Sequence, residues 1–163
     1  MGVFGIAIAT VILPVLSQKY TSKNITGYKK TLSRSLKSVL IFSLPAAIGL
    51  IILSDHIIIS LFQYGNFMYD DTNMSSLSLI AYSLGLPAFI MMKILLTGFF
   101  SRQDTRTPVK YGLIAVFFNI VMNTVVVIYY LDNPFEGAHA FLALATSISA
   151  WICLLYTSDA ADE

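Results

Sequence analysis

Charged residues are scarce in this sequence. They make up 12% of the chain, whereas hydrophobic residues make up 56%, and the mean hydropathy is +0.75. Soluble domains carry about 25% charged residues, so the composition excludes an ordinary water-soluble core. It predicts long apolar stretches that cross a lipid bilayer.

Cysteine and histidine are almost absent as well. Cys153 is the one cysteine, which excludes an internal disulfide, and His56 and His139 are too few for a metal-binding cluster. The sequence shows no grouping of nucleophile, base and orienting residue and no glycine-rich phosphate loop. We therefore expect no catalytic residue, metal or cofactor, and no nucleic-acid partner; the chain is predicted not to be an enzyme.

The sequence begins without a signal peptide and ends in an unusual segment. Met1 leads directly into an apolar stretch, without the basic region and cleavage site of a signal peptide, so we interpret it as an internal start. Residues 153–163 read CLLYTSDAADE, which is the in-frame translation of a common transposase-type sequencing adapter. We predict that 153–163 is a non-native read-through tail; a short native polar tail is the alternative.

Five apolar stretches occupy the rest of the sequence. They predict an all-α, polytopic transmembrane bundle of about five membrane-spanning helices, forming a partial lobe over residues 1–152. The expected helices are at about 2–17, 33–54, 74–100, 108–131 and 137–152. Residues 28–39 place apolar side chains at helical spacing, so the second helix is expected to begin before its apolar run, and this prefix is expected to lie along the membrane surface.

The charges of the connecting loops alternate along the chain. The first and third loops are basic, with Lys19, Lys23, Lys29, Lys30, Arg34 and Lys37 in one and Arg102, Arg106 and Lys110 against Asp104 in the other. The second and fourth loops carry acids without a base, namely Asp55, Asp70 and Asp71, then Asp132 and Glu136. The positive-inside rule places the basic loops in the cytoplasm, and five crossings satisfy the alternation.

Proline and capping residues mark the helices. Pro14, Pro45 and the Gly85–Pro87 pair lie inside apolar stretches, where a proline removes a backbone hydrogen bond and bends a helix. Thr107 before Pro108 is predicted to cap the fourth helix. Asp71 or Thr72 is expected to cap the third helix in the same way.

Lys93 is the most informative single residue. It lies nine residues before Arg102, which is roughly 13 to 14 Å below that end of a helix. A charge at the centre of a membrane helix costs on the order of 2.5 to 3.5 kcal/mol. Either the lysine reaches the cytoplasmic headgroups, or it faces a wet cavity, where an ammonium group suits an anionic substrate such as a diphosphate.

Asn119 and Asn123 are one turn apart on the fourth predicted helix, so their amides share a face of an apolar span. They are interpreted first as interhelical hydrogen-bonding residues. The second interpretation is that their carbonyl oxygens contribute to a cation or substrate site.

The polar turn at 101–110 separates two spans. Its charged and capping residues are Arg102, Asp104, Arg106, Thr107 and Pro108. One interpretation is an anchor that contacts lipid phosphates and contains an Arg–Asp pair. The other is a cytoplasmic gate, in which opposed charges lock or release the helices.

Four segments resemble successive signatures of the lipid II flippase (MurJ/MviN) family, in the same order and at similar spacing. They are GVFGIAIATVILPVLS at 2–17, SLFQYGNF at 60–67, AYSLGLPAFIMMKIL at 81–95 and GFFSRQDTRTPVK at 98–110. The resemblance covers residues 2 to about 152. Lys93 matches a lysine in that family, and the five residues of the polar turn match its cytoplasmic loop motif.

The resemblance implies a fragment of a larger transporter of the multidrug, oligosaccharidyl-lipid and polysaccharide exporter superfamily. The parent would be a multi-pass protein of the bacterial inner membrane, moving lipid-linked peptidoglycan precursor from the cytoplasmic to the periplasmic leaflet by alternating access. Its expected partners are that precursor, membrane lipids and the rest of the parent chain, including a missing first lobe.

Three other functions remain open on the sequence. One is a related exporter of O-antigen-type lipids or drugs. Another is a membrane transferase that uses polyprenyl-phosphate substrates; it would need paired carboxylates, for which the adjacent Asp70 and Asp71 are candidates. A purely structural membrane subunit is the third.

Overall fold

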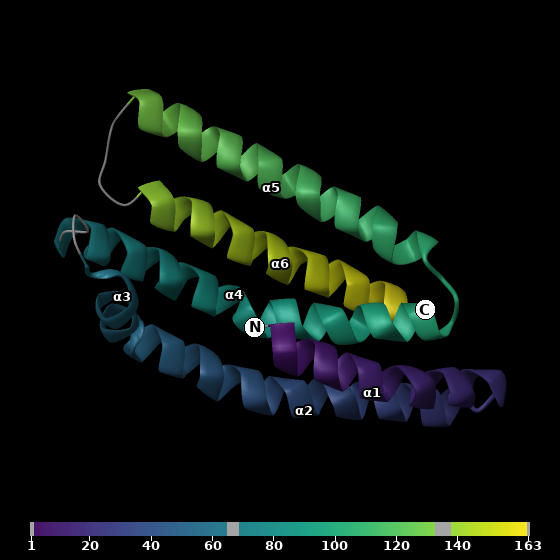
Figure 1. The fold of residues 1–163 in the computed structure, drawn as a ribbon. Helices are drawn as coiled ribbons and strands as arrows, with labels where there is room; N and C mark the ends of the chain where they lie inside the picture. The colour runs from purple at the N-terminus through teal and green to yellow at the C-terminus, as the bar shows by residue number, and fades with distance from the viewer. Residues whose placement is uncertain (1, 65–68, 133–137, 163) are drawn as a thin grey trace.

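The structure is a computed structural model that describes residues 2–64, 69–132 and 138–162, and the regular structure in these ranges is entirely α-helical. The helices are α1 (Gly2–Thr21), α2 (Ile25–Ile52), α3 (Ser54–Phe62), α4 (Tyr69–Ser101), α5 (Arg106–Asp132) and α6 (Ala138–Asp162). The helices α1, α2, α4, α5 and α6 run roughly side by side along one long axis, whereas the short α3 lies at an angle to it (Figure 1). The predicted all-α class is confirmed.

The described residues contain four helices that are long and apolar enough to cross a membrane. They are Ile25–Ile52, Tyr69–Ser101, Arg106–Leu131 and His139–Asp159. The remaining predicted span, the first at about 2–17, corresponds to α1, a helix of 20 residues that is not among the four. The predicted count of about five is therefore close.

The basic turns lie at one end of the bundle. The turn between α1 and α2 and the turn between α4 and α5 share this end, whereas α3 and the first residues of α4 lie at the other (Figure 1). Asp55 is in the first turn of α3, and Asp70 and Asp71 are in the first turn of α4. The separation of charges predicted from the loops is thus present for these residues; Glu136 and the Asp132 side chain lie outside the described residues.

The second predicted helix differs from the structure at both ends. α2 begins at Ile25 and continues without a break to Ile52, so the expected surface prefix is part of the same helix. Asn24 caps it, because the Asn24 side chain accepts a hydrogen bond from the Gly27 N–H. Pro45 lies inside the helix without ending it. α3 is a separate short helix that follows a break at Leu53.

The caps of the later helices also differ from expectation. α4 begins at Tyr69, so Asp71 and Thr72 lie inside its first turn rather than before it. α5 begins at Arg106, and the side chain that accepts its first N–H groups belongs to Asp104, not to Thr107. Pro108 is the third residue of α5, still within the first turn, where its missing N–H breaks no helical bond.

α6 extends to Asp162, beyond the expected end at 152. Cys153, Leu154 and Thr157 are buried on it. Apolar and small side chains continue the helical pattern whatever the origin of the segment, so the read-through origin of 153–163 stays a prediction.

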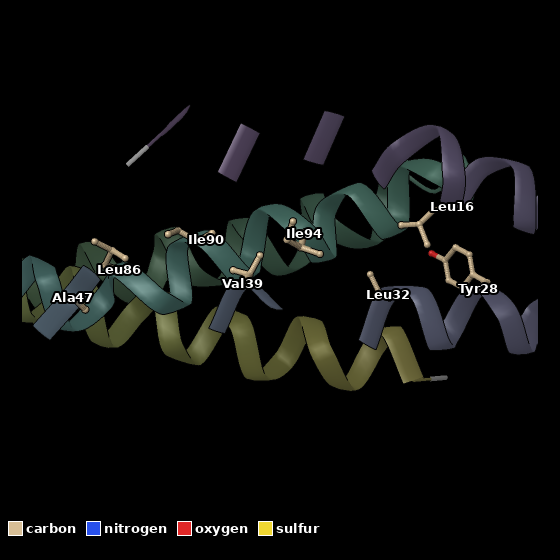
Figure 2. Packing of buried hydrophobic residues seen from close by; sticks show 8 residues of the cluster. All are labelled: Leu16, Tyr28, Leu32, Val39, Ala47, Leu86, Ile90 and Ile94. Carbon is tan, nitrogen blue, oxygen red and sulfur yellow. The ribbon is translucent and has the colours of Figure 1, made fainter. Parts of the chain in front are cut away.

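α4 is the central helix and packs on two faces. On one face, side chains four residues apart form the main apolar cluster with α1 and α2; its buried members are Leu16, Tyr28, Leu32, Val39, Ala47, Leu86, Ile90 and Ile94 (Figure 2). On the other face, Ala88 and Leu95 pack with Ala150 and Leu154 of α6. α5 packs mainly against α6, at the edge of the bundle.

Candidate functional site

Lys93 lies on α4, on the side that meets the beginning of α1. A Cβ atom placed on Gly5 would be 3.2 Å from the Lys93 Cδ atom, so the lysine stem runs directly past this glycine. The side chain is half-buried. Among the described residues, its ammonium group forms no hydrogen bond and no ion pair.

The two predicted asparagines form a hydrogen-bonded chain between α5 and α6. The Asn123 Nδ2 atom donates to Asn119 Oδ1 at 2.9 Å, and Asn119 Nδ2 donates to the Thr146 hydroxyl at 3.4 Å. Thr146 in turn donates to the Leu142 carbonyl at 3.0 Å. The interhelical interpretation therefore describes Asn119, with Thr146 as a partner that the sequence did not reveal, whereas Asn123 bonds to Asn119 within α5.

One polar atom of this chain has no partner. The Asn123 Oδ1 atom is buried and accepts no hydrogen bond. Asn119 and Thr146 also line a cavity of about 390 Å³ between α4, α5 and α6, together with Met92, Ser149 and Cys153 among others. The Asn119 amide thus borders open space, and the unpartnered Asn123 oxygen is buried one helical turn away from it.

Lys93 and the asparagines do not converge on one site within this chain. The lysine stem contacts α1, whereas Asn119 is hydrogen-bonded to α6. These surfaces are on different sides of the central helix α4, which packs against α1 on one face and α6 on another. A site that uses both would need to be completed by other parts of a larger protein.

The Gly85–Pro87 segment of α4 is held by α6. The Ser147 hydroxyl donates to the Ala81 carbonyl at 2.7 Å, and the Trp151 indole N–H donates to the Leu84 carbonyl at 3.1 Å. Gly85 allows this approach, because a Cβ there would be 2.6 Å from Ser147 Oγ. Two carbonyl groups near the proline, those of Ala81 and Leu84, therefore accept hydrogen bonds from a neighbouring helix.

Tyr28 joins the two basic turns. Its hydroxyl donates to the Gly98 carbonyl at 2.7 Å, and Ser101 donates to the Tyr28 oxygen at 3.3 Å. The Arg102 guanidinium lies over the Tyr28 ring, 4.6 Å from its centroid. Tyr28 is 2% exposed, so a buried, hydrogen-bonded ring connects α2 to α4 at this point. The sequence pattern indicated only an apolar position here.

The predicted Arg–Asp pair of the polar turn is not found among the described residues, because neither the Arg102 nor the Arg106 guanidinium forms an ion pair with Asp104. Arg102 stacks on Tyr28, while the Asp104 Oδ1 atom accepts from the N–H groups of Arg106 at 3.0 Å and Thr107 at 3.2 Å. Hydrogen bonds from the side chain and then the backbone of Thr107 are the main reasons that the pKa of Asp104 is below its ordinary value. The carboxylate is thus the cap of α5, and the Arg102 charge is not neutralised by it.

Comparison with known proteins gives the family. The sequence profile of the family described as "Lipid II flippase MurJ" matches residues 1–158. The chain belongs to the MurJ family. Because the match includes residues 153–158, it reaches into the segment predicted to be read-through.

Two curated relatives are similar over nearly the whole chain. A probable lipid II flippase MurJ of Vibrio cholerae serotype O1 is 42% identical over 96% of this chain, and that of Haemophilus influenzae is 37% identical over 92%. The chain spans 29% of the length of each. A solved structure titled lipid II flippase MurJ, inward closed conformation, is 31% identical with a TM-score of 0.82, and the match covers 99% of this chain and 32% of that one.

MurJ membership and the apolar helices together confirm the predicted location. The chain is a multi-pass inner-membrane protein of a transporter family. The resemblance stated from the four sequence segments is confirmed as well.

Proposed function

We propose that this chain forms part of the second lobe of a lipid II flippase, which moves the lipid-linked peptidoglycan precursor from the cytoplasmic to the periplasmic leaflet by alternating access and without covalent chemistry. The observation that carries the proposal is the match of 99% of the chain to a solved flippase at a TM-score of 0.82. The transferase alternative is less well supported. Its candidate carboxylates, Asp70 and Asp71, lie in the first turn of α4, where acidic side chains interact favourably with the helix dipole.

Lys93 is the proposed contact to the anionic part of the precursor. Its ammonium lies within an apolar helix and has no partner among the described residues, while Gly5 leaves room for its stem on the α1 side. An unpaired charge in a low-dielectric region costs on the order of 2.5 to 3.5 kcal/mol. A diphosphate entering a cavity beside α4 would remove that cost, so binding and transport depend on this residue.

Asn119 and Asn123 are proposed to line the route on the other side of α4. The Asn119 amide joins α5 to α6 through Thr146 and borders a cavity, while Asn123 bonds to Asn119 within α5 and its buried Oδ1 atom has no partner. A substrate hydroxyl or amide can donate to that oxygen. We place these residues second to Lys93, because their hydrogen bonds also serve helix packing.

The residues of the polar turn are proposed to keep the cytoplasmic ends of the helices together during transport. Arg102 acts through Tyr28, and Asp104 acts through the first N–H groups of α5, which include those of Arg106 and Thr107. Pro108 is buried at the same turn. In this proposal the gate consists of a cation–ring contact and a helix cap, rather than an Arg–Asp pair.

The test is a chimera. Residues 1–158 of this chain replace the matching part of the Vibrio cholerae relative, and the chimera is expressed in cells depleted of their own flippase. We expect growth to be restored, and Lys93→Ala to lower growth and the delivery of precursor to the periplasm by tenfold or more, as expected for loss of a buried charged contact.

A matched lysine variant keeps this test specific. Lys30 is exposed on α2, and Lys30→Ala is expected to grow as the unmodified chimera does. Lys93→Arg, which keeps the charge, should restore part of the activity. Full growth with Lys93→Ala would show that this lysine only reaches the headgroups, and failure of a well-expressed unmodified chimera would contradict the flippase assignment.

A further inference from the structure

The two basic turns meet around one cavity. It has a volume of about 540 Å³ and lies between α1, the start of α2, the end of α4 and the two turns. The lining residues include Ser17, Tyr20, Lys23, Ile25, Arg102 and Gln103. This volume is within the range of about 300–1,000 Å³ that small ligands occupy. We call it the basic-turn cavity.

Both turns have the same backbone construction. Lys23 (φ 56°) and Gln103 (φ 59°) are the described non-glycine residues with positive φ. The N–H of the residue after each one bonds back to the last helical turn, from Asn24 to the Lys19 carbonyl and from Asp104 to the Phe99 carbonyl. This is the Schellman geometry, which normally has glycine at the left-handed position. Here the two left-handed residues carry polar side chains, and both border the cavity.

The cavity holds positive charge without an acid. The residues that line it include no Asp or Glu, and Asp104 is engaged with the first N–H groups of α5. Arg102 uses the face of its guanidinium for Tyr28, so the N–H groups on its edge remain available. No partner of the Lys23 ammonium is found among the described residues, in contrast to Lys19, whose ammonium donates to Thr31.

The neighbourhood of these cations is amphipathic. Ile25, which lines the cavity, is 61% exposed, and Tyr20 is 46% exposed. The Tyr20 ring also meets the edge of Tyr28, with centroids 6.2 Å apart. Exposed apolar and aromatic residues next to cations are typical of the depth at which lipid headgroups meet acyl chains. Free phosphate would use the cations but not this apolar rim.

We propose that the basic-turn cavity binds the phosphate headgroup of an anionic phospholipid of the cytoplasmic leaflet. Lys23 and the edge of Arg102 contact the phosphate, the Gln103 amide and the Ser17 hydroxyl offer further donors, and Ile25 packs against the start of an acyl chain. The site includes neither Lys93 nor the asparagines of the proposed transport route, it shares Arg102 with the proposed gate, and it requires no lipid-linked precursor.

The test measures retained lipid by native mass spectrometry of this chain in detergent, with phosphatidylglycerol and phosphatidylcholine of identical acyl chains as probes. The unmodified chain should retain phosphatidylglycerol preferentially. Lys23→Asn should lower that retention about fivefold, the effect of one cation near a membrane surface. Asparagine tolerates the left-handed conformation at this position, so the variant should keep its helix content by circular dichroism.

Lys30→Gln is the control for non-specific attraction between lipid and the basic surface of the protein, because Lys30 is exposed on α2 and does not line the cavity. It should change retention less than twofold. An equal loss with Lys30→Gln, or equal retention of the two lipids by the unmodified chain, would overturn the proposal. Displacement of phosphatidylglycerol by millimolar inorganic phosphate would overturn the lipid assignment in favour of a phosphate site. None of these results affects the flippase proposal, since the chimera experiment measures growth.

Discussion

Helices α4 and α5 are equally suited to cross a membrane by composition, yet they have different surroundings. In the most apolar window of α4, 44% of the residues are buried inside the bundle, whereas none of the corresponding α5 residues are. Small residues explain the difference. α4 buries Ser83, Gly85, Ala88 and Gly98, which let neighbouring helices approach closely, while α5 presents branched and aromatic side chains outward.

This contrast shows what hydropathy measures. A hydropathy value reports how a helix partitions between water and lipid, and lipid tails are as apolar as a packed interior. The number of helical neighbours depends instead on side-chain size at the contact. The comparison can be tested with pairs of identical substitutions, one in each helix.

The largest difference is expected for shortening an isoleucine. Ile94 of α4 is 0% exposed, whereas Ile120 of α5 is 57% exposed. Ile94→Ala should lower the free energy of unfolding by about 2–5 kcal/mol, because it leaves a cavity in the α1–α2–α4 cluster. Ile120→Ala should change it by less than about 0.5 kcal/mol. The measurement is unfolding by SDS in mixed micelles, followed by circular dichroism; equal effects would mean that α4 and α5 are equally packed.

An intermediate difference is expected for adding a methyl group to glycine. A Cβ on Gly85 would lie 2.9 Å from the Ser147 Cβ, while a Cβ on Gly112 of α5 meets nothing within 4 Å. Gly85→Ala should destabilise by about 1–3 kcal/mol through overpacking. Gly112→Ala should be neutral or stabilising by up to about 1 kcal/mol, as alanine favours a helix. A Gly85→Ala protein as stable as the unmodified chain in the same SDS titration would refute the close α4–α6 contact.

The smallest effect is expected for the Asp104 cap at the start of α5, and it appears only at acidic pH. The pKa of Asp104 is lowered in the folded chain from an ordinary 3.8. Its stabilising contribution is therefore complete above the ordinary value and is lost as the pH falls through the lower, folded value. The hydrogen exchange of the Arg106 and Thr107 amides, which donate to this carboxylate, should accelerate in that acid range relative to Asp104→Asn. Identical pH profiles in the two proteins would exclude the cap.

The sequence was sufficient for the features that depend on partition into lipid. The all-α class, the number of spans to within one and the placement of basic turns at one end follow from apolar length and loop charge. The continuous α2 could not be predicted, because residues 28–37 are charged on one side and apolar on the other. Such a pattern fits a surface helix and the first turns of a span equally well.

Contacts between residues far apart in the chain could not be predicted from the sequence. Asn119 and Asn123 share a helix face because of their spacing, but Thr146 as their partner depends on how α6 is rotated. The contact between Tyr28 and Gly98 joins residues 70 positions apart. The sequence feature that could have indicated this contact is a tyrosine at an apolar helix position, since a buried tyrosine hydroxyl usually has a hydrogen-bond partner.

The Trp151 hydrogen bond to Leu84, described above at the Gly85–Pro87 segment, gives the chain a built-in optical reporter. The sequence contains one tryptophan, so intrinsic fluorescence excited at the red edge comes from the α4–α6 interface alone. If α6 slides or rotates relative to α4, the indole exchanges a carbonyl partner for lipid or water and its emission maximum shifts. Movement at this point of the bundle can therefore be followed in real time without a label.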